Sequence, residues 1–195
     1  KADTVVAGAI VSGTSVTIAS DTLTTLAVTG DTGARLIADL AGATTTVTGT
    51  ITSGAAGDDI SFDAGSTDLI SVDMGAGNDT VRLTTAPGLL TGSTTTGSQT
   101  IVGGEGTDTL VTGVALSKTT NTGISGFETL RVTGSATVVL DAAKNDISTL
   151  IVDGASGGTI TGVEAGATLD LTTAGSVSLD KTTTGAITVN VGNSS

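Results

Sequence analysis

The amino-acid sequence predicts an all-β fold, a parallel β-solenoid or β-roll with rungs of about 20 residues. Thr, Val, Ile, Leu, Ala and 29 Gly fill the chain, and this composition favours short strands that end in tight turns. Apolar residues alternate with a period of two and almost nowhere with the helical period. Similar segments recur along the 195 residues, which are enough for one large domain or two small ones.

The clearest repeats lie in the second half of the chain, where strand-like segments begin at four threonines. These are Thr129, Thr149, Thr168 and Thr188. They are 20, 19 and 20 residues apart, so each segment is expected to form one strand of a solenoid rung. Second strands within these rungs are expected at residues 138–140, near Ile160 and at residues 177–179.

The repeat is less regular in the first half of the chain. Residues 26–30 hold a further copy of the strand segment. Ile60 and Thr80 are 20 residues apart, as are Val81 and Ile101, which indicates that the same rung length persists there.

Longer spacing between two glycines indicates an insertion. Gly77 and Gly106 are 29 residues apart, so we expect a surface loop around residues 86–97. The chain then divides into a Thr/Val/Ala-rich stretch (about 1–53), a segment of Gly/Asp turns (about 54–111) and plain rungs (about 112–195). We expect these to form one continuous elongated domain, and the sequence to be a piece of a longer chain.

A nine-residue pattern of glycines and one aspartate marks three turns of the middle segment. Residues 103–111 match G-G-x-G-x-D-x-U-x, where U is a large apolar residue, at every fixed position. Residues 74–82 lack only the first glycine, and residues 54–62 lack the second glycine and carry Ser61 at the apolar position. This pattern is typical of calcium-binding turns, although any single copy is also ordinary turn chemistry.

The chemistry of the pattern suits calcium, which binds roughly six to eight oxygen atoms from carboxylates and backbone carbonyls. Glycines at the first, second and fourth positions are expected to adopt φ > 0 and to aim carbonyl groups inward. The sixth-position aspartates Asp59, Asp79 and Asp108 are expected to add the negative charge. Residues 58–108 carry eight acids and one base, Arg82, so we expect this segment to be loose without calcium and ordered with it.

The composition excludes several classes of function. The chain has no Cys and no His, which rules out disulfides, thiol catalysis, His-ligated zinc and histidine acid–base catalysis. A net charge of −12 makes nucleic acid and anionic membranes unfavourable partners. No apolar run is long enough to insert into a membrane. No set of residues supports catalysis, and we expect a protein that is not an enzyme.

The order of these motifs resembles that of RTX-type bacterial surface-layer (S-layer) proteins, most closely the Caulobacter type. The resemblance rests on residues 57–59, 75–81, 103–108 and 126–132. It implies a protein secreted by a type I system to the bacterial cell surface, where it folds on extracellular Ca²⁺ and assembles into a lattice. The metal-site residues that it implies are Gly57, Asp59, Gly75, Gly77, Asp79, Gly104, Gly106 and Asp108. We expect Asp58 and Asn78 to belong to the same metal site. Phe127 is expected to be a core residue.

We therefore expect a structural surface-layer protein that self-assembles in a calcium-dependent way, with any contact to cell-surface polysaccharide made by a region outside these residues. An RTX-type adhesin or calcium-dependent binding module would share every motif. A polysaccharide-cleaving β-helix enzyme is disfavoured because only 1% of the residues are aromatic. An ice-binding solenoid would need threonines in register on a flat face. The Thr triplets at 44–46, 94–96 and 182–184 lie near glycines, which predicts turns instead.

Overall fold

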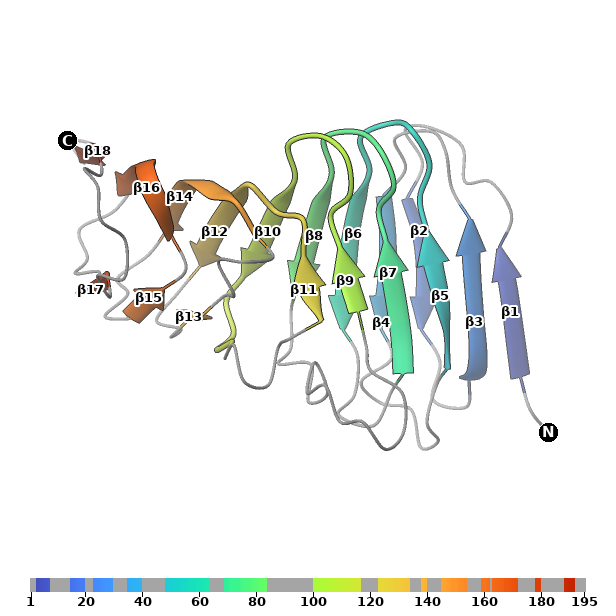
Figure 1. Ribbon diagram of the computed structural model, residues 1–195. Helices are drawn as coiled ribbons and strands as arrows, with labels where there is room; N and C mark the ends of the chain where they lie inside the picture. The colour runs from blue at the N-terminus through green and yellow to red at the C-terminus, as the bar shows by residue number, and fades with distance from the viewer. Residues whose placement is uncertain are drawn as a thin grey trace.

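The computed structural model describes an all-β chain whose parallel strands stack as in a β-solenoid, so the predicted fold class is confirmed (Figure 1). The described residues are 3–7, 15–19, 23–29, 35–39, 48–63, 69–83, 100–116, 123–133, 138–139, 145–153, 159–161, 163–171, 178–179 and 188–191. These residues contain no helix. Accordingly, the described part of the chain offers no helix long and apolar enough to cross a membrane.

The strands form three parallel sheets. The six-stranded sheet consists, in order, of β1 (Asp3–Ala7), β3 (Leu23–Thr29), β5 (Thr48–Thr52), β7 (Leu69–Asp73), β9 (Thr100–Val102) and β11 (Ile124–Ser125). The nine-stranded sheet consists of β2 (Ser15–Ala19), β4 (Arg35–Asp39), β6 (Asp59–Asp63), β8 (Thr80–Leu83), β10 (Thr109–Thr112), β12 (Thr129–Thr133), β14 (Ile147–Asp153), β16 (Val163–Leu171) and β18 (Thr188–Val191). The three-stranded sheet consists of β13 (Val138–Val139), β15 (Thr159–Thr161) and β17 (Ser178–Leu179).

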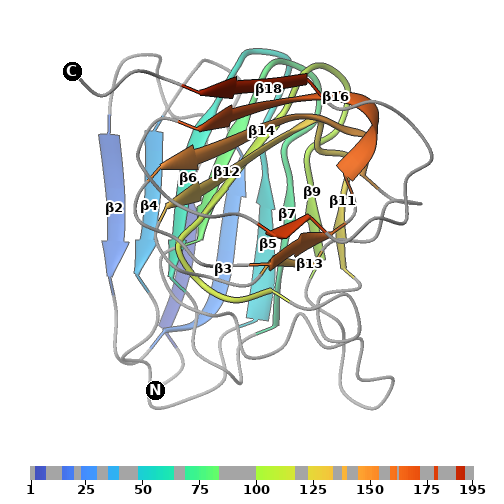
Figure 2. The same ribbon diagram turned by 90° about the vertical axis from the view of Figure 1, so that its left-hand side faces the viewer.

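Successive strands alternate between the two large sheets from β1 to β12, so each rung adds one strand to each sheet. In Figure 1 the arrows of the six-stranded sheet point up, and those of β2, β4, β6, β8 and β10 in the nine-stranded sheet point down. The view in Figure 2 shows the nine-stranded sheet twisting between β2 and β18, as parallel sheets of L-residues do.

Aliphatic side chains fill the space between the two large sheets in rows that follow the stack. One row comes from the six-stranded sheet and contains Ile51, Val72, Ile101 and Ile124, each paired in register with the next. The other comes from the nine-stranded sheet and contains Ile60, Val81, Leu110, Leu130 and Leu150. None of these side chains is more than 2% exposed, so the predicted period-two alternation does mark the core.

The repeats predicted in the second half of the chain are confirmed by the strand register. Thr129 pairs with Thr149, Thr149 with Thr168, and Thr168 with Thr188. The expected second strands correspond to β13, β15 and β17, which pair with one another in their own sheet.

Two of the alignments predicted in the first half are wrong. Ile60 pairs with Val81, not with Thr80, so that spacing was one residue short. Val81 pairs with Leu110, whereas Ile101 lies in the other large sheet and pairs with Val72. A slip of one residue would turn the core-facing side chains outward, which is why burial and not a constant spacing sets the register.

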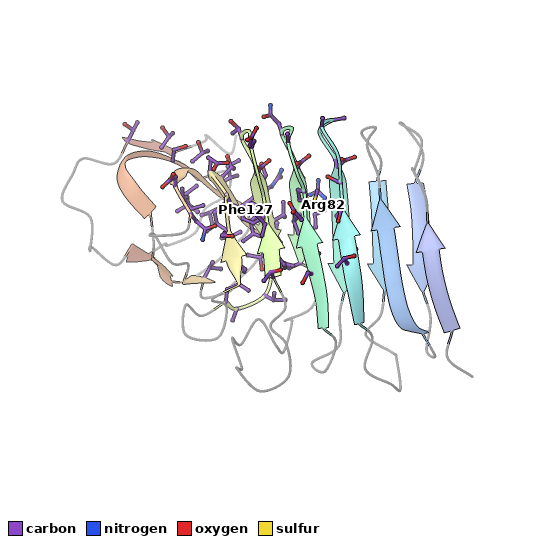
Figure 3. The ribbon with its side chains drawn as sticks, turned by 45° about the vertical axis from the view of Figure 1, so that its right-hand side comes forward. Arg82 and Phe127 are labelled. Carbon is purple, nitrogen blue, oxygen red and sulfur yellow. The ribbon has the colours of Figure 1, made fainter. Side chains whose placement is uncertain are left out.

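The six-stranded sheet ends at β11, and the three-stranded sheet follows it along the stack. An isolated parallel bridge between Leu116 and Val138 joins the two regions. Phe127 lies between β11 and β12 and is fully buried, as predicted, and Figure 3 labels it among the side chains of this region. It is the largest fully buried side chain among the described residues.

Replacing Phe127 with Ala should lower the free energy of unfolding by about 3–5 kcal/mol, because the smaller side chain leaves a cavity where the sheets change over. Thr133→Ala, at an exposed position of β12, is the control and should change it by less than about 0.5 kcal/mol. Urea unfolding followed by far-UV circular dichroism measures both, since the chain has no Trp or Tyr. Equal midpoints for the two variants would contradict this role of Phe127.

Candidate metal site in the stacked turns

Four turns lie one above another at one edge of the solenoid, where the chain passes from the six-stranded to the nine-stranded sheet. We call them the stacked turns; they comprise residues 53–58, 74–79, 103–108 and 126–128. The first three lie at the top of Figure 1, between β5 and β6, β7 and β8, and β9 and β10. Each aspartate-bearing motif found in the sequence therefore overlaps one turn.

Backbone hydrogen bonds hold the stacked turns in register. The N–H of Ala76 donates to the carbonyl of Gly54 (2.9 Å), and the N–H of Glu105 donates to the carbonyl of Gly75 (2.8 Å). The N–H of Gly77 returns a bond to the carbonyl of Glu105 (2.8 Å). The turns are thus joined directly through their peptide groups.

Glycine is required in these turns because the backbones approach closely. Gly104 and Gly106 have φ of 111° and 138°, values that L-residues with a side chain rarely adopt. A Cβ added to Gly104 would lie 1.9 Å from the carbonyl oxygen of Gly75, and one added to Gly106 would lie 1.6 Å from that of Gly77. These distances are far inside van der Waals contact, so an added methyl group would force the turns apart.

The prediction that motif glycines adopt φ > 0 holds at Gly75, Gly77, Gly104 and Gly106 but is wrong at the first motif position. Gly103 does not have a positive φ; it is needed because its Cβ would lie 1.8 Å from the carbonyl oxygen of the next turn. The prediction is also wrong at Gly57, the fourth position of the first copy, which lacks a positive φ and whose Cβ would lie 2.8 Å from the carbonyl oxygen of Asn78.

Four acidic residues at equivalent positions of the turns form a hydrogen-bonded row, which we call the acid row: Asp58, Asp79, Asp108 and Glu128. The N–H of Asp58 donates to Oδ1 of Asp79 (2.7 Å), and the N–H of Asp79 donates to Oδ1 of Asp108 (2.8 Å). The N–H of Asp108 donates to Oε2 of Glu128 (2.8 Å). The carboxylates of Asp79, Asp108 and Glu128 thus each accept a bond from the backbone of the preceding rung.

The acid row corrects the assignment of the first sequence motif. That motif placed Asp59 at the sixth position, but Asp59 begins β6 and pairs with Thr80, so its neighbour Asp58 is the residue in register with Asp79. The Asp59 carboxylate instead accepts bonds from Arg82, at 2.9 Å from Nε and 3.1 Å from Nη2 (Figure 3 labels Arg82). A side chain already engaged in a bidentate ion pair is a poorer metal ligand.

Two carboxylates of the acid row are buried with one oxygen unused. Asp79 is 1% exposed and Asp108 is 0% exposed, and Oδ2 of each accepts no hydrogen bond. Burial raises the pKa of Asp79 to about 6; the hydrogen bond from the Asp58 N–H opposes this rise, and the charges of Asp108 and Asp58 add to it. Burial also raises the pKa of Asp108, against the bond from the Asp79 N–H.

The remaining acidic and amide side chains of the turns lie at the surface or outside the described positions. Asn78 is exposed, and its Oδ1 accepts the N–H of Thr107 (2.9 Å). Asp73 is exposed and accepts the N–H of Gly75 (3.1 Å), while Glu105 is exposed. The side chains of Asp63 and Asp68, and the Thr triplets at 44–46, 94–96 and 182–184, are outside the described residues.

The described residues offer buried oxygen atoms to a cation, but they do not form a complete set of acidic ligands. Buried carboxylate oxygens without a donor, at Asp79 and Asp108, are the kind of atom that a bound ion or water satisfies. Among the described residues, however, no three acids converge as metal ligands do. A calcium ion here would need these carboxylate oxygens together with backbone carbonyls of the turns and water, a mixed set that calcium accepts.

Sequence reasoning missed Glu128, the last member of the acid row. It sits in a Gly-Phe-Glu turn that lacks the second glycine and the spacing of the nine-residue pattern. The available signal was its position immediately before Thr129, since Asp79 and Asp108 also immediately precede a threonine that begins a strand.

Gly106→Ala should lower the free energy of unfolding by about 2–4 kcal/mol, because it adds a strained φ and a backbone clash. Glu105→Ala, an exposed neighbour in the same turn, should change it by less than about 0.5 kcal/mol. Chemical denaturation of both variants measures the difference. Similar midpoints would show that the turns tolerate a side chain and that their close stacking is incorrect.

In chelator, the protein should become less stable as the pH rises from about 4 to about 6. The folded-state pKa of Asp79 (about 6) lies above its ordinary value (3.8), so the folded protein holds a proton that the unfolded chain has released in this window. Melting temperatures measured across the window test this. Asp79→Asn should flatten the dependence of the melting temperature on pH. Asp73→Asn, at an exposed position, should leave that dependence unchanged. A profile that rises with pH would contradict the assignment.

Comparison of the chain with protein-family models, curated proteins and solved structures finds no match.

Proposed function

We propose that the chain is a calcium-dependent structural solenoid, part of a protein that assembles with copies of itself in a layer on a bacterial cell surface. The observation that carries the proposal is the pair of buried carboxylate oxygens, Oδ2 of Asp79 and Oδ2 of Asp108, that accept no hydrogen bond. Burying a carboxylate without a counter-charge is unfavourable, and a divalent cation offsets that cost.

The chemistry of the turns supports calcium as the cation. The chain has no His and no Cys, so its candidate ligands are oxygen atoms, which calcium prefers over softer ligands. When bound, calcium supplies positive charge between carboxylates that otherwise repel one another. Asp79 and Asp108 would each offer Oδ2, while Oδ1 of each continues to accept the N–H of the preceding rung.

A structural role outside the cell is supported by the sequence and by the shape of the fold. The motifs resemble those of RTX-type surface-layer proteins, which work where calcium is abundant. A net charge of −12 suits a protein that gains its counter-ions from a calcium-rich medium. Each rung of a solenoid contacts only its neighbours, so the stack forms an extended body of the kind that suits a structural role.

Calcium should stabilise the protein through Asp108 and not through Asp59, although both occupy the sixth position of a sequence motif. One site at a calcium concentration of about 100 times its Kd adds about 2.7 kcal/mol to the free energy of unfolding. Asp108→Asn should remove most of this gain, because it deletes a charge from the acid row. Asp59→Asn should keep the gain and lose at most about 1 kcal/mol from its surface ion pair.

Calorimetric titration with Ca²⁺, together with melting curves in calcium and in chelator, measures these effects. No heat of binding and no shift of the melting curve in the unsubstituted protein would refute the calcium site. Loss of the gain in both variants would instead assign calcium to the sequence motif and not to the acid row.

An adhesin or calcium-dependent binding module is the alternative function, and it shares the calcium site. Electron microscopy of the calcium-loaded protein separates the two. Ordered sheets support a surface layer, whereas isolated rods at every concentration favour an adhesin or spacer.

A further inference from the structure

The turn that ends at Glu128 differs from the others in length. Six residues, 103–108, connect β9 to β10, whereas three residues, 126–128, connect β11 to β12. The flanking strands nevertheless stay in register, because Thr109 pairs with Thr129 and the N–H of Gly103 donates to the carbonyl of Ser125 (2.9 Å). The fourth turn therefore covers the third with three residues fewer.

Glu128 spans this shortened turn with its longer side chain. Its Oε2 accepts the N–H of Asp108 at 2.8 Å, the same kind of contact that Asp79 and Asp108 make in the preceding rungs. Its own backbone is fixed from both sides. The Glu128 N–H donates to the carbonyl of Asp108 (3.2 Å), and its carbonyl accepts the N–H of Ser148 (2.9 Å) and of Thr149 (3.1 Å).

The acid row stops at Glu128. Thr129 pairs with Thr149, so the residue in register with Glu128 in the next rung is Ser148, which carries no carboxylate. Its N–H bonds to the carbonyl of Glu128 and not to a side chain. Asp108 is thus the last aspartate of the row, and its N–H donates to Glu128, a residue outside the nine-residue motif.

We propose that Glu128 is the positioning residue of the last aspartate: it holds the backbone of Asp108 so that Oδ2 stays inside the turn, where the cation proposed above would bind. The inference rests on that proposed function for its ligand. The Oδ2 atom depends on this anchoring because it points toward Gly103: a Cβ on that glycine would lie 2.9 Å from it. Glu128 has this role because its side chain is long enough to reach the Asp108 N–H across the shorter turn. The exposed acids of the turns do not share this role.

Two substitutions of Glu128 separate reach from charge. Glu128→Gln keeps the length and an oxygen acceptor but removes the charge, whereas Glu128→Asp keeps the charge and shortens the side chain by one methylene. Glu105→Gln is the matched control, since it removes the same charge from an exposed acid of the adjacent turn. Each variant is measured by hydrogen exchange of the Asp108 amide and by calorimetric titration with Ca²⁺.

Glu128→Asp should lower the protection of the Asp108 amide and the calcium affinity about tenfold or more, as expected when one charge-assisted hydrogen bond is lost. Glu128→Gln should keep both within about threefold, as should Glu105→Gln. The opposite pattern, in which Gln loses affinity and Asp keeps it, would overturn the inference and make Glu128 a direct ligand.

Two further outcomes keep the test decisive. If Glu128→Asp does not fold, Glu128→Gln decides alone, and a tenfold loss of amide protection in it overturns the inference. If even the unsubstituted protein binds no Ca²⁺, the proposed function fails, while amide protection at Asp108 still decides whether Glu128 positions that residue.

Discussion

Close stacking of backbone on backbone at the Gly/Asp turns is the constraint on which the rest of this structure depends. At Gly104 and Gly106 the backbone of one turn approaches the carbonyl oxygens of the next so closely that a Cβ would fall within 2 Å of them (1.9 and 1.6 Å). This approach lets the peptide groups of successive turns bond to one another. It also aligns the acidic side chains that stand at equivalent positions of successive turns.

Alignment of the acids has opposite effects on stability. The carboxylates of Asp79, Asp108 and Glu128 each accept a backbone N–H of the neighbouring rung, and a charged acceptor makes such a bond strong. The same alignment buries Asp79 and Asp108, which raises the pKa of each, and the charges of Asp108 and Asp58 add to the rise at Asp79. A row of this kind holds the rungs together best where its charge is lowered, because buried like charges repel one another.

The sequence was sufficient for the fold class but not for the register of the first half. The four threonines from Thr129 onward mark rungs of nearly constant length, and the strands pair as that period requires. Upstream, Asp59, Thr80 and Thr109 occupy one register position, at intervals of 21 and 29 residues. Variable connections absorb the difference, so a constant spacing misplaces strands there even though the core rows are regular.

The candidate site was predicted in part for a similar reason. Counting from Gly57 as the fourth residue of the motif selects Asp59, whereas backbone contact places Gly77 against Ala56 and so brings Asp58 into the row. Two adjacent aspartates cannot be told apart by a motif that tolerates mismatches.

The end of the acid row coincides with the change of architecture, and one cause explains both. A turn of six residues, such as 103–108, leaves room for a glycine backbone to fold inward beneath an aspartate. The turn at Gly126 is shorter, so a bulky apolar residue, Phe127, fills the interior and the acid must reach further, which glutamate does. Beyond it the six-stranded sheet gives way to the three-stranded one. Where the interior of the turn is filled by Phe127, no aspartate occupies the buried position that Asp79 and Asp108 have in the preceding turns.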